Sequence, residues 1–350
     1  MKKVARKVGF TISGLLILLL GGGAAWAMHY GAGKLPIRRY FPANYTNAVW
    51  DWSNIENKTA VALKNQANFM HMHQLNAVYV DIGAYASIVG EKDEAQRTTD
   101  QQKLESAIVR YVTALQGQGI RVYAAAGDTH WSDAEKQYIP LAILLFAQDY
   151  NAHHPKAQLA GVEFDVESYN QEGFSTGSVT VKSLVLVDYL TMVDRLVQAN
   201  LNYVNRTHAT FELGFAIPYW FDNENGNIPS VTWQEKTGPV LFHLLDRLNA
   251  LPRSNVVVMA YRNAARGSDG VIAHARTEVD YAQAKAPRIR VMIGQEVNDV
   301  QPAKITYFGS SHTELSAQFE YIKDELGPSG VLGGIAINDL AGYQAMEDGD

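Results

Sequence analysis

The sequence predicts an α/β protein built as a single (β/α)8 barrel, preceded by an N-terminal signal or anchor segment. The chain has 350 residues and is 47% hydrophobic, which suits one large barrel with a substantial core. Eight short apolar runs alternate with stretches of helical spacing, and eight is the number of strands that closes such a barrel. An open, doubly wound sheet is the alternative. It is disfavoured because no Gly-rich phosphate-binding fingerprint follows the first run.

Each expected strand is a short run rich in Val, Ile or aromatic residues. The runs are Ala48–Trp52, Ala77–Ile82, Arg121–Ala126, Gly161–Glu167, Phe211–Pro218, Asn255–Tyr261, Arg290–Gln295 and Gly333–Asp339. Between the runs, apolar residues return at helical spacing, as at Leu315, Phe319 and Ile322. This alternation indicates parallel strands joined by helical crossovers, so we expect the barrel to span residues 46–350.

The N-terminus has the pattern of a targeting segment. Four basic residues in the first seven precede an apolar run, Phe10–Leu20, and Ala25-Trp26-Ala27 has the small-x-small form of a signal-peptidase site. The stretch from Phe10 to Met28 is also about long enough to span a bilayer. Residues 1–28 are therefore predicted to be a signal peptide or a membrane anchor, and residues 29–45 a linker. Either form leaves the barrel outside the cytoplasm, secreted or tethered to the membrane.

Charge and composition remove several classes of function. The formal net charge is −6 and the basic residues form no stripe, so nucleic acid is not an expected partner. The chain has no cysteine, which rules out disulfides, zinc–thiolate sites and cysteine nucleophiles. The ten histidines are scattered without a His-x-x-x-His spacing. We therefore expect neither a metal site nor a cofactor.

Acidic, amide and aromatic side chains gather where the expected strands end. In a (β/α)8 barrel this end carries the active site. The candidates for substrate binding, beside Glu163 of the fourth run, are Trp50, Asp51, Asp81, Asp128, Trp131, Trp220, Arg262, Asn338 and Asp339. Sugar rings stack on aromatic faces, and sugar hydroxyls pair with carboxylates and amides. The pattern therefore predicts a polysaccharide or oligosaccharide as the partner.

The fourth run carries the strongest chemical signal. Side chains alternate along a strand, so Glu163, Asp165 and Glu167 share one face, which we expect to point into the barrel. Like charges at close range raise at least one carboxyl pKa, and a carboxyl that is protonated near neutral pH can serve as a general acid. Alternatively, the three acids pair with Arg262 or hold a cation.

Residues 160–167, Ala-Gly-Val-Glu-Phe-Asp-Val-Glu, resemble the Asp-Gly-x-Asp-x-Asp-x-Glu motif of glycoside hydrolase family 18, which includes chitinases and endo-N-acetylglucosaminidases. Met259-Ala260-Tyr261 likewise resembles that family's Met-x-Tyr on strand six. The resemblance implies Glu167 as general acid, with Asp165 orienting the substrate's 2-acetamido group and Tyr261 hydrogen-bonded to it. Hydrolysis would retain configuration with the acetamido oxygen as nucleophile. The last strand, residues 334–339, also resembles that of a group of bacterial glycosidase-like barrels.

Two other functions remain open on the sequence. Glu296 ends the seventh expected strand, where barrels of the large retaining clan place a nucleophile opposite a strand-four acid/base, here Glu167. Alternatively, Glu296 is a partner of an arginine. A non-catalytic carbohydrate-binding barrel is the third hypothesis, because Asn338-Asp339 stands where family 18 has a tryptophan near the end of strand eight.

Overall fold

The computed structural model describes residues 41, 44–223, 226 and 228–349. The predicted signal or anchor segment, residues 1–28, lies outside the described residues, as does most of the predicted linker. Phe41 and Tyr45, from the described part of that linker, each pack against the Phe319 ring at a centroid distance of 5.9 Å. Among the described residues, no helix has both the length and the apolar character needed to cross a bilayer.

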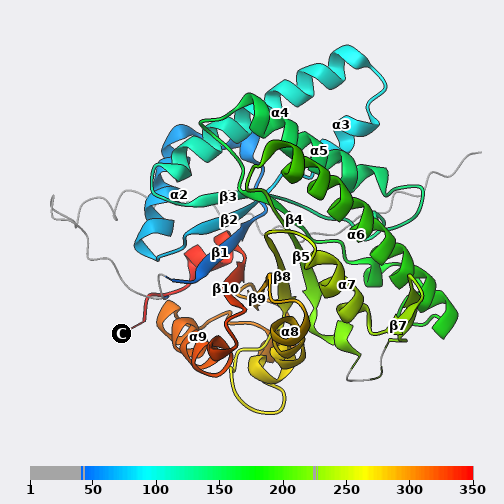
Figure 1. Ribbon diagram of the computed structural model, residues 1–350. Coiled ribbons are helices and arrows are strands. Elements are labelled where there is room, and N and C mark those ends of the chain that lie inside the picture. The colour runs from blue at the N-terminus through cyan, green and yellow to red at the C-terminus, as the bar shows by residue number, and fades with distance from the viewer. Residues whose placement is uncertain (1–40, 42–43, 224–225, 227, 350) are drawn as a thin grey trace, which may run out of the picture. The chain divides into compact units, whose positions relative to one another are not determined.

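Eight parallel strands close into a barrel in the order β1-β10-β9-β8-β5-β4-β3-β2 (Figure 1). They are β1 (Thr46–Asp51), β2 (Ala77–Asp81), β3 (Arg121–Ala126), β4 (Gly161–Phe164), β5 (Glu212–Pro218), β8 (Ser254–Met259), β9 (Ile289–Glu296) and β10 (Leu332–Asn338). Strand β1 pairs in parallel with β2 on one side and with β10 on the other, which closes the sheet. The predicted (β/α)8 barrel is confirmed, and the open sheet is wrong.

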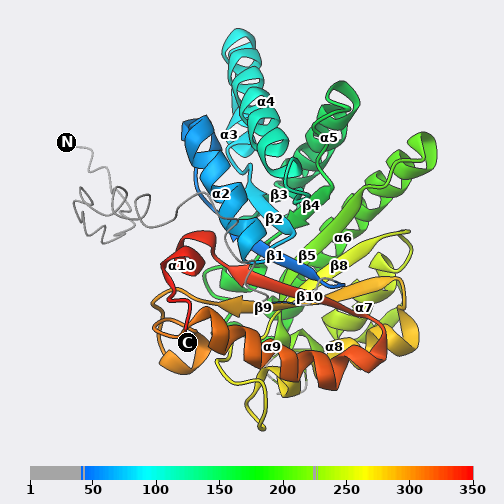
Figure 2. The ribbon, with the colours of Figure 1, turned by 90° about the vertical axis from the view of Figure 1, so that its left-hand side faces the viewer.

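Helices follow the strands and surround the barrel (Figures 1 and 2). They are α2 (Ala60–Met72), α3 (Tyr85–Gly90), α4 (Glu94–Gln116), α5 (Tyr138–His153), α6 (Val179–Thr207), α7 (Val240–Leu248), α8 (Val271–Lys285), α9 (His312–Leu326) and α10 (Leu340–Ala345). Side chains of Thr59, Asp93, Ser178 and Ser311 accept backbone N–H groups at four helix starts, which satisfies donors that the helix itself leaves unpaired. A short hairpin, β6 (Val231–Trp233) with β7 (Lys236–Gly238), lies between β5 and α7.

Alternation along the strands produces two apolar cores. Outward residues such as Val162 and Phe164 belong to the large core that also contains buried helix residues. The inward core is smaller and contains Trp50, Tyr79 and Tyr123 together with several alanines. Because small residues line much of the interior, polar side chains such as Glu163, fully buried on β4, have room inside the barrel.

Strand β4 ends at Phe164, three residues before the predicted end at Glu167. The Asp165 amide still donates to Ala126 of β3 at 3.0 Å, and a 3-10 turn then begins at Ser168. Gly127 permits this path, because a Cβ at Gly127 would lie 1.8 Å from the carbonyl oxygen of Asp165. Asp165 and Glu167 are thus held on irregular backbone at the carboxyl end of the barrel.

Candidate active site

A pocket of about 230 Å³ opens at the carboxyl ends of the strands. Its lining contains Trp50, Trp52, Asp165, Glu167, Ala216, Val257, Met259, Tyr261 and Asn338. These residues come from or directly follow β1, β4, β5, β8 and β10. The pocket therefore brings together three of the four predicted catalytic residues, Asp165, Glu167 and Tyr261, with two of the predicted binding residues, Trp50 and Asn338.

Asp165 is a carboxyl group held in a dry environment. Burial, and to a smaller extent the neighbouring Glu167 carboxylate, together raise its pKa to about 7. The Oδ1 atom of Asp165 is buried and has no hydrogen-bond partner among the described residues. A buried acceptor without a donor is energetically costly, so Asp165 is suited to receive an N–H or O–H from a ligand in the pocket.

Glu163 lies one inward position earlier on β4 and is fully buried. Gly214 on β5 makes room for it, because a Cβ at Gly214 would lie 1.9 Å from Oε2 of Glu163 and 2.5 Å from the Asn255 amide nitrogen. Burial raises the Glu163 pKa well above its usual value; the neighbouring Asn255 amide opposes the shift, while Glu212 and Asp165 add to it. Glu163 does not line the pocket, so its place is in the barrel interior.

Glu167 is fixed by two residues of the 3-10 turn that follows it. The Tyr169 hydroxyl donates to Oε1 of Glu167, and the Asn170 amide donates to Oε2 at 2.9 Å. Trp220, a predicted binding residue after β5, packs edge-on against the Tyr169 ring at 4.9 Å and so supports Glu167 indirectly. These contacts hold the carboxyl group at the pocket wall, with both oxygens already oriented.

Tyr261 contributes a phenol that stays protonated. Burial raises its pKa well above the usual value, and the carboxylates of Asp165, Glu296 and Glu167 each add to that shift. A phenol that does not ionise can donate a hydrogen bond throughout the neutral range. Tyr261 is thus a hydrogen-bond donor beside the two acids of the pocket.

Two tryptophans form the aromatic wall of the pocket: Trp50 lies on β1, and Trp52 comes directly after β1. The rings of Trp50 and Trp52 stack at 4.9 Å and 11°. Trp52 is 38% exposed, and its Nε1 donates to Oδ1 of Asn338 at 2.9 Å. The pair presents a flat, partly wet aromatic surface of the kind that sugar rings stack on.

Glu296 is saturated with hydrogen bonds and does not line the pocket. Its Oε1 accepts from the backbone amides of Val297 and Asn298 and from the Asn298 side chain, at 2.7–2.9 Å. Its Oε2 accepts from Asn338 at 2.7 Å. An arginine partner for Glu296 is not found among the described residues: Arg262 pairs with Asp269 and Arg266 lies over the Tyr321 ring. Glu296 thus organises the end of β9.

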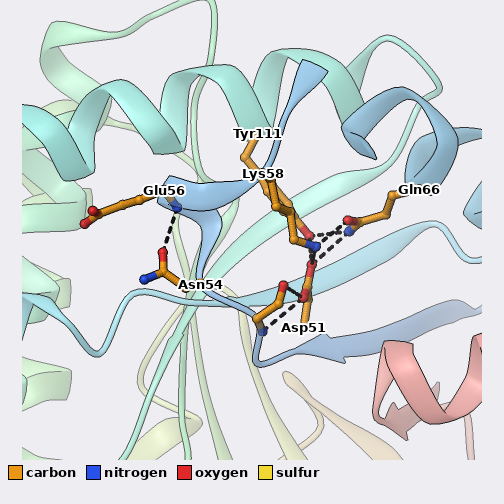
Figure 3. Close-up of polar contacts among 7 residues, drawn as sticks. Asp51, Asn54, Glu56, Lys58, Gln66 and Tyr111 are labelled. Carbon is orange, nitrogen blue, oxygen red and sulfur yellow. Dashed lines mark hydrogen bonds and ion pairs between the residues drawn. The ribbon is translucent and has the colours of Figure 1, made fainter. Parts of the chain in front are cut away.

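Asp51 points away from the pocket into a polar network between β1, α2 and α4 (Figure 3). Its Oδ2 accepts from Lys58 at 2.7 Å, from Gln66 at 2.9 Å and from the Tyr111 hydroxyl at 2.5 Å. Burial raises the Asp51 pKa, but Lys58 and the hydrogen bonds outweigh burial and leave it lowered. This carboxylate is occupied by the protein itself.

The other predicted binding residues also lie outside the pocket lining. Asp81 and Asp128 accept backbone amides two residues ahead, from Gly83 at 2.7 Å and His130 at 2.8 Å. Asp339 caps α10 through Gly342, and Trp131 is buried in the outer core. Arg262 is tied to Asp269, so it does not neutralise the strand-four acids. All five residues therefore have a local structural role: Trp131, Asp81, Asp128, Asp339 and Arg262.

One group of described residues has metal-ligand spacing away from this pocket. Potential ligand atoms of His73, His312 and Asp348 lie within 4.8 Å of one another. However, Nε2 of His312 lies 2.7 Å from the Tyr343 carbonyl, and the two histidine rings pack on Tyr343 and on each other. The two histidines and Tyr343 thus form an aromatic cluster.

Beside the apolar residues of the lining, three aromatic or polar contributors to the site were not among the sequence predictions: Trp52, Tyr169 and Asn170. Trp52 could have been found, because it stands two residues after Trp50 and shares its face in an extended segment. Tyr169 and Asn170 reach back to Glu167 through a 3-10 turn, and no pattern in the sequence marks that turn.

Solved structures with a similar fold include family 18 chitinases. A chitinase from Cycas revoluta in complex with (GlcNAc)3 has a TM-score of 0.51 at 10% identity, covering 84% of this chain and 95% of its own. The chain shares the (β/α)8 barrel fold of this chitinase. A family 18 chitinase from Pseudoalteromonas aurantia has a TM-score of 0.48 at 15% identity, covering 84% of this chain and 93% of its own. A β-glucosidase from Thermotoga maritima has a TM-score of 0.49 at 9% identity, covering 86% and 89%. No protein-family model and no curated protein sequence matches the chain.

Proposed function

We propose that this family 18-like barrel is a glycoside hydrolase that acts on a polysaccharide containing N-acetylhexosamine, by substrate-assisted hydrolysis with retention of configuration. One observation carries the proposal: Asp165, Glu167 and Tyr261 line one pocket together with a stacked tryptophan pair. The resemblance of residues 160–167 and 259–261 to family 18 motifs supports the same reaction.

The two pocket acids supply the proton. Burial and the Glu167 carboxylate raise the Asp165 pKa to about 7, so Asp165 can hold a proton near neutral pH. In the proposed reaction, Glu167 gives a proton to the glycosidic oxygen as the bond from that oxygen to the anomeric carbon breaks. The proton returns to Glu167 when water later attacks the anomeric carbon, so the enzyme is unchanged after one turnover.

Asp165 and Tyr261 handle the acetamido group. The buried, unpartnered Oδ1 of Asp165 is suited to accept the acetamido N–H, and the Tyr261 hydroxyl to donate to the acetamido oxygen. That oxygen forms a bond to the anomeric carbon as the leaving group departs, and positive charge spreads over the resulting ring. A carboxylate at the acetamido nitrogen stabilises this charge in the low-dielectric pocket.

A retaining mechanism with Glu296 as nucleophile has less support. The four hydrogen bonds to Glu296 stabilise its carboxylate and reduce its nucleophilicity, and an attacking oxygen would have to give up at least one of them. The pocket lining does not include Glu296. We therefore assign it to positioning, through Asn338, of the Trp52 indole.

A matched pair of substrates tests the proposal. (GlcNAc)4 and the β-1,4-linked glucose tetramer share linkage and length, and they differ in the 2-acetamido group. We expect turnover of (GlcNAc)4 and none of the glucose tetramer, because the latter lacks the nucleophile. Turnover confined to the glucose tetramer would reject the substrate-assisted reaction, and saturable binding of (GlcNAc)4 without turnover would mean a non-catalytic barrel.

We also propose that the barrel acts outside the cytoplasm, either secreted or tethered to a membrane. The basic start, the apolar run from Phe10 to Leu20 and Ala25-Trp26-Ala27 support this location. Cell fractionation with mass spectrometry of the N-terminus tests it. A mature protein that starts near residue 28, or an intact one in the membrane fraction, is expected; an intact chain in the cytosol would contradict it.

A further inference from the structure

The barrel carries a second pocket at the opposite end, where the strands begin. Its volume is about 610 Å³, which falls in the range of small-molecule sites. Thr46, Arg121 and Glu212, the first residues of β1, β3 and β5, belong to its lining. The pocket with Asp165 and Glu167 lies where the strands end, so the two pockets are separated by the length of the barrel.

Arginines are the main charged residues in the lining of this second pocket. Arg121, Arg253, Arg288 and Arg290 all contribute to it, and all four side chains are exposed. None of the four forms an ion pair with an acidic side chain among the described residues, although the chain has a net charge of −6. Four uncompensated guanidinium groups around one hollow create a positive potential that attracts anions.

The single acidic side chain of the lining, Glu212, is turned toward the barrel interior. Its Oε2 accepts from the Tyr123 hydroxyl at 2.9 Å, and its Oε1 accepts from the Asn255 amide at 3.4 Å. Burial and Glu212 together raise the Tyr123 pKa, so that hydroxyl remains a donor to the carboxylate. Glu212 is therefore engaged by neutral donors and does not pair with the arginines.

Two of the arginines are preoriented. Arg121 donates to the Tyr123 hydroxyl and to Oγ1 of Thr46, each at 2.8 Å, and its guanidinium lies 5.6 Å from the Tyr123 ring centre. Arg290 donates to the Gly330 carbonyl at 2.9 Å. A guanidinium has five N–H donors, so each of these side chains keeps donors for a ligand after its internal bonds are made.

We infer that this pocket binds an anion with two or more phosphate or carboxylate groups, independently of the sugar site. Planar guanidinium groups bind both kinds of oxyanion in a bidentate manner, and several arginines around one hollow favour a ligand with several negative groups. A phosphorylated or carboxylated saccharide and a small polyanion share this chemistry. The volume accommodates either one.

Calorimetric titration of the folded protein with pyrophosphate and with citrate, at constant ionic strength, tests the inference. The variant Arg253→Gln/Arg288→Gln removes two charges and no core contact, since both side chains are exposed. Arg206→Gln, an exposed arginine at the end of α6, is the matched control. We expect wild type and Arg206→Gln to bind at least one probe equally well, and the double variant to bind it at least tenfold more weakly.

The stronger probe identifies the ligand chemistry: pyrophosphate indicates phosphate groups and citrate indicates carboxylates. Arg290→Gln is an independent test, and it should weaken binding of the same probe. Equal affinity of the double variant and the wild type, or binding of neither probe by the wild type, would overturn the inference. Thermal unfolding of each variant checks that the loss of binding is not a loss of fold.

Discussion

The indole N–H of Trp52 donates a 2.9 Å hydrogen bond to Oδ1 of Asn338. The same Asn338 amide donates to Oε2 of Glu296 at 2.7 Å. Asn338 thus connects an aromatic wall of the pocket, which follows β1, to a buried carboxylate at the end of β9.

The Asn338→Ala variant should lose this connection. Trp52 would keep its stack on Trp50 but lose its hydrogen bond to the Asn338 side chain, and Oε2 of Glu296 would lose the Asn338 donor. We expect KM for (GlcNAc)4 to rise about tenfold, equivalent to about 1.4 kcal/mol, with a smaller change in kcat. Trp52→Phe, which keeps an aromatic face but lacks the N–H, should raise KM less. Unchanged KM in both variants would contradict a role for Trp52 in binding.

The buried Glu163 predicts a pH-dependent stability. Its folded-state pKa is raised, so the folded protein binds the Glu163 proton more tightly than the unfolded chain does. Stability from this group is complete below the unfolded pKa of about 4.5 and is lost as pH rises toward the folded value. Relative to wild type, Glu163→Gln should therefore gain about 1.4 kcal/mol per pH unit above about pH 5. Denaturant unfolding of both proteins at several pH values measures this, and a constant difference would refute it.

The Asp51 network predicts a loss of folding stability in the Asp51→Asn variant. Asp51 is 3% exposed and its partner Lys58 is 16% exposed, so removing the carboxylate leaves a poorly solvated ammonium group. Asp51→Asn should lower the free energy of unfolding by about 3–5 kcal/mol. The double variant Asp51→Asn/Lys58→Met should recover part of the lost stability, because the unpaired charge of Lys58 is gone. A loss below about 1 kcal/mol, as for an exposed pair, would show that the network contributes little.

The strand pattern made the fold predictable because period-2 alternation and helical spacing are local. All eight expected runs overlap an observed strand, and the alternation at Val162, Glu163 and Phe164 assigned the faces of β4 correctly. The strand ended earlier than predicted, at Phe164, because a close backbone approach between Gly127 and Asp165 diverts the chain. That approach joins segments 38 residues apart and leaves no local mark in the sequence.

Which polar residues face the pocket was less predictable. Trp50, Asp165, Tyr261 and Asn338 come together, whereas Asp51 differs from Trp50 by one position and therefore points to the opposite face. Asp81, Asp128 and Asp339 are used by the backbone amides just after them. A carboxylate at a strand end can accept backbone amides of the following loop as readily as it can bind a ligand. Only the three-dimensional path of the backbone shows which of the two it does.

The acid pair predicts the pH profile of hydrolysis. Asp165 has a pKa of about 7, so this carboxyl group should lose its proton as pH rises through neutrality. We expect kcat/KM for (GlcNAc)4 to fall on the alkaline side with an apparent pKa near 7. In Asp165→Asn the residual kcat/KM should fall at a different alkaline pH, since residue 165 no longer titrates. Identical profiles for the two proteins would separate Asp165 from the reaction.

The assignment of the acid at the pocket is tested most directly by comparing three variants on one substrate. Turnover of (GlcNAc)4 is measured for Glu167→Gln, Asp165→Asn and Glu296→Gln, each checked for an unchanged unfolding temperature. We expect kcat to fall roughly 10²–10⁴-fold in Glu167→Gln, nearly as far in Asp165→Asn, and only mildly in Glu296→Gln. A loss in Glu296→Gln as severe as in Glu167→Gln, with Asp165→Asn active, would contradict it and identify Glu296 as the nucleophile.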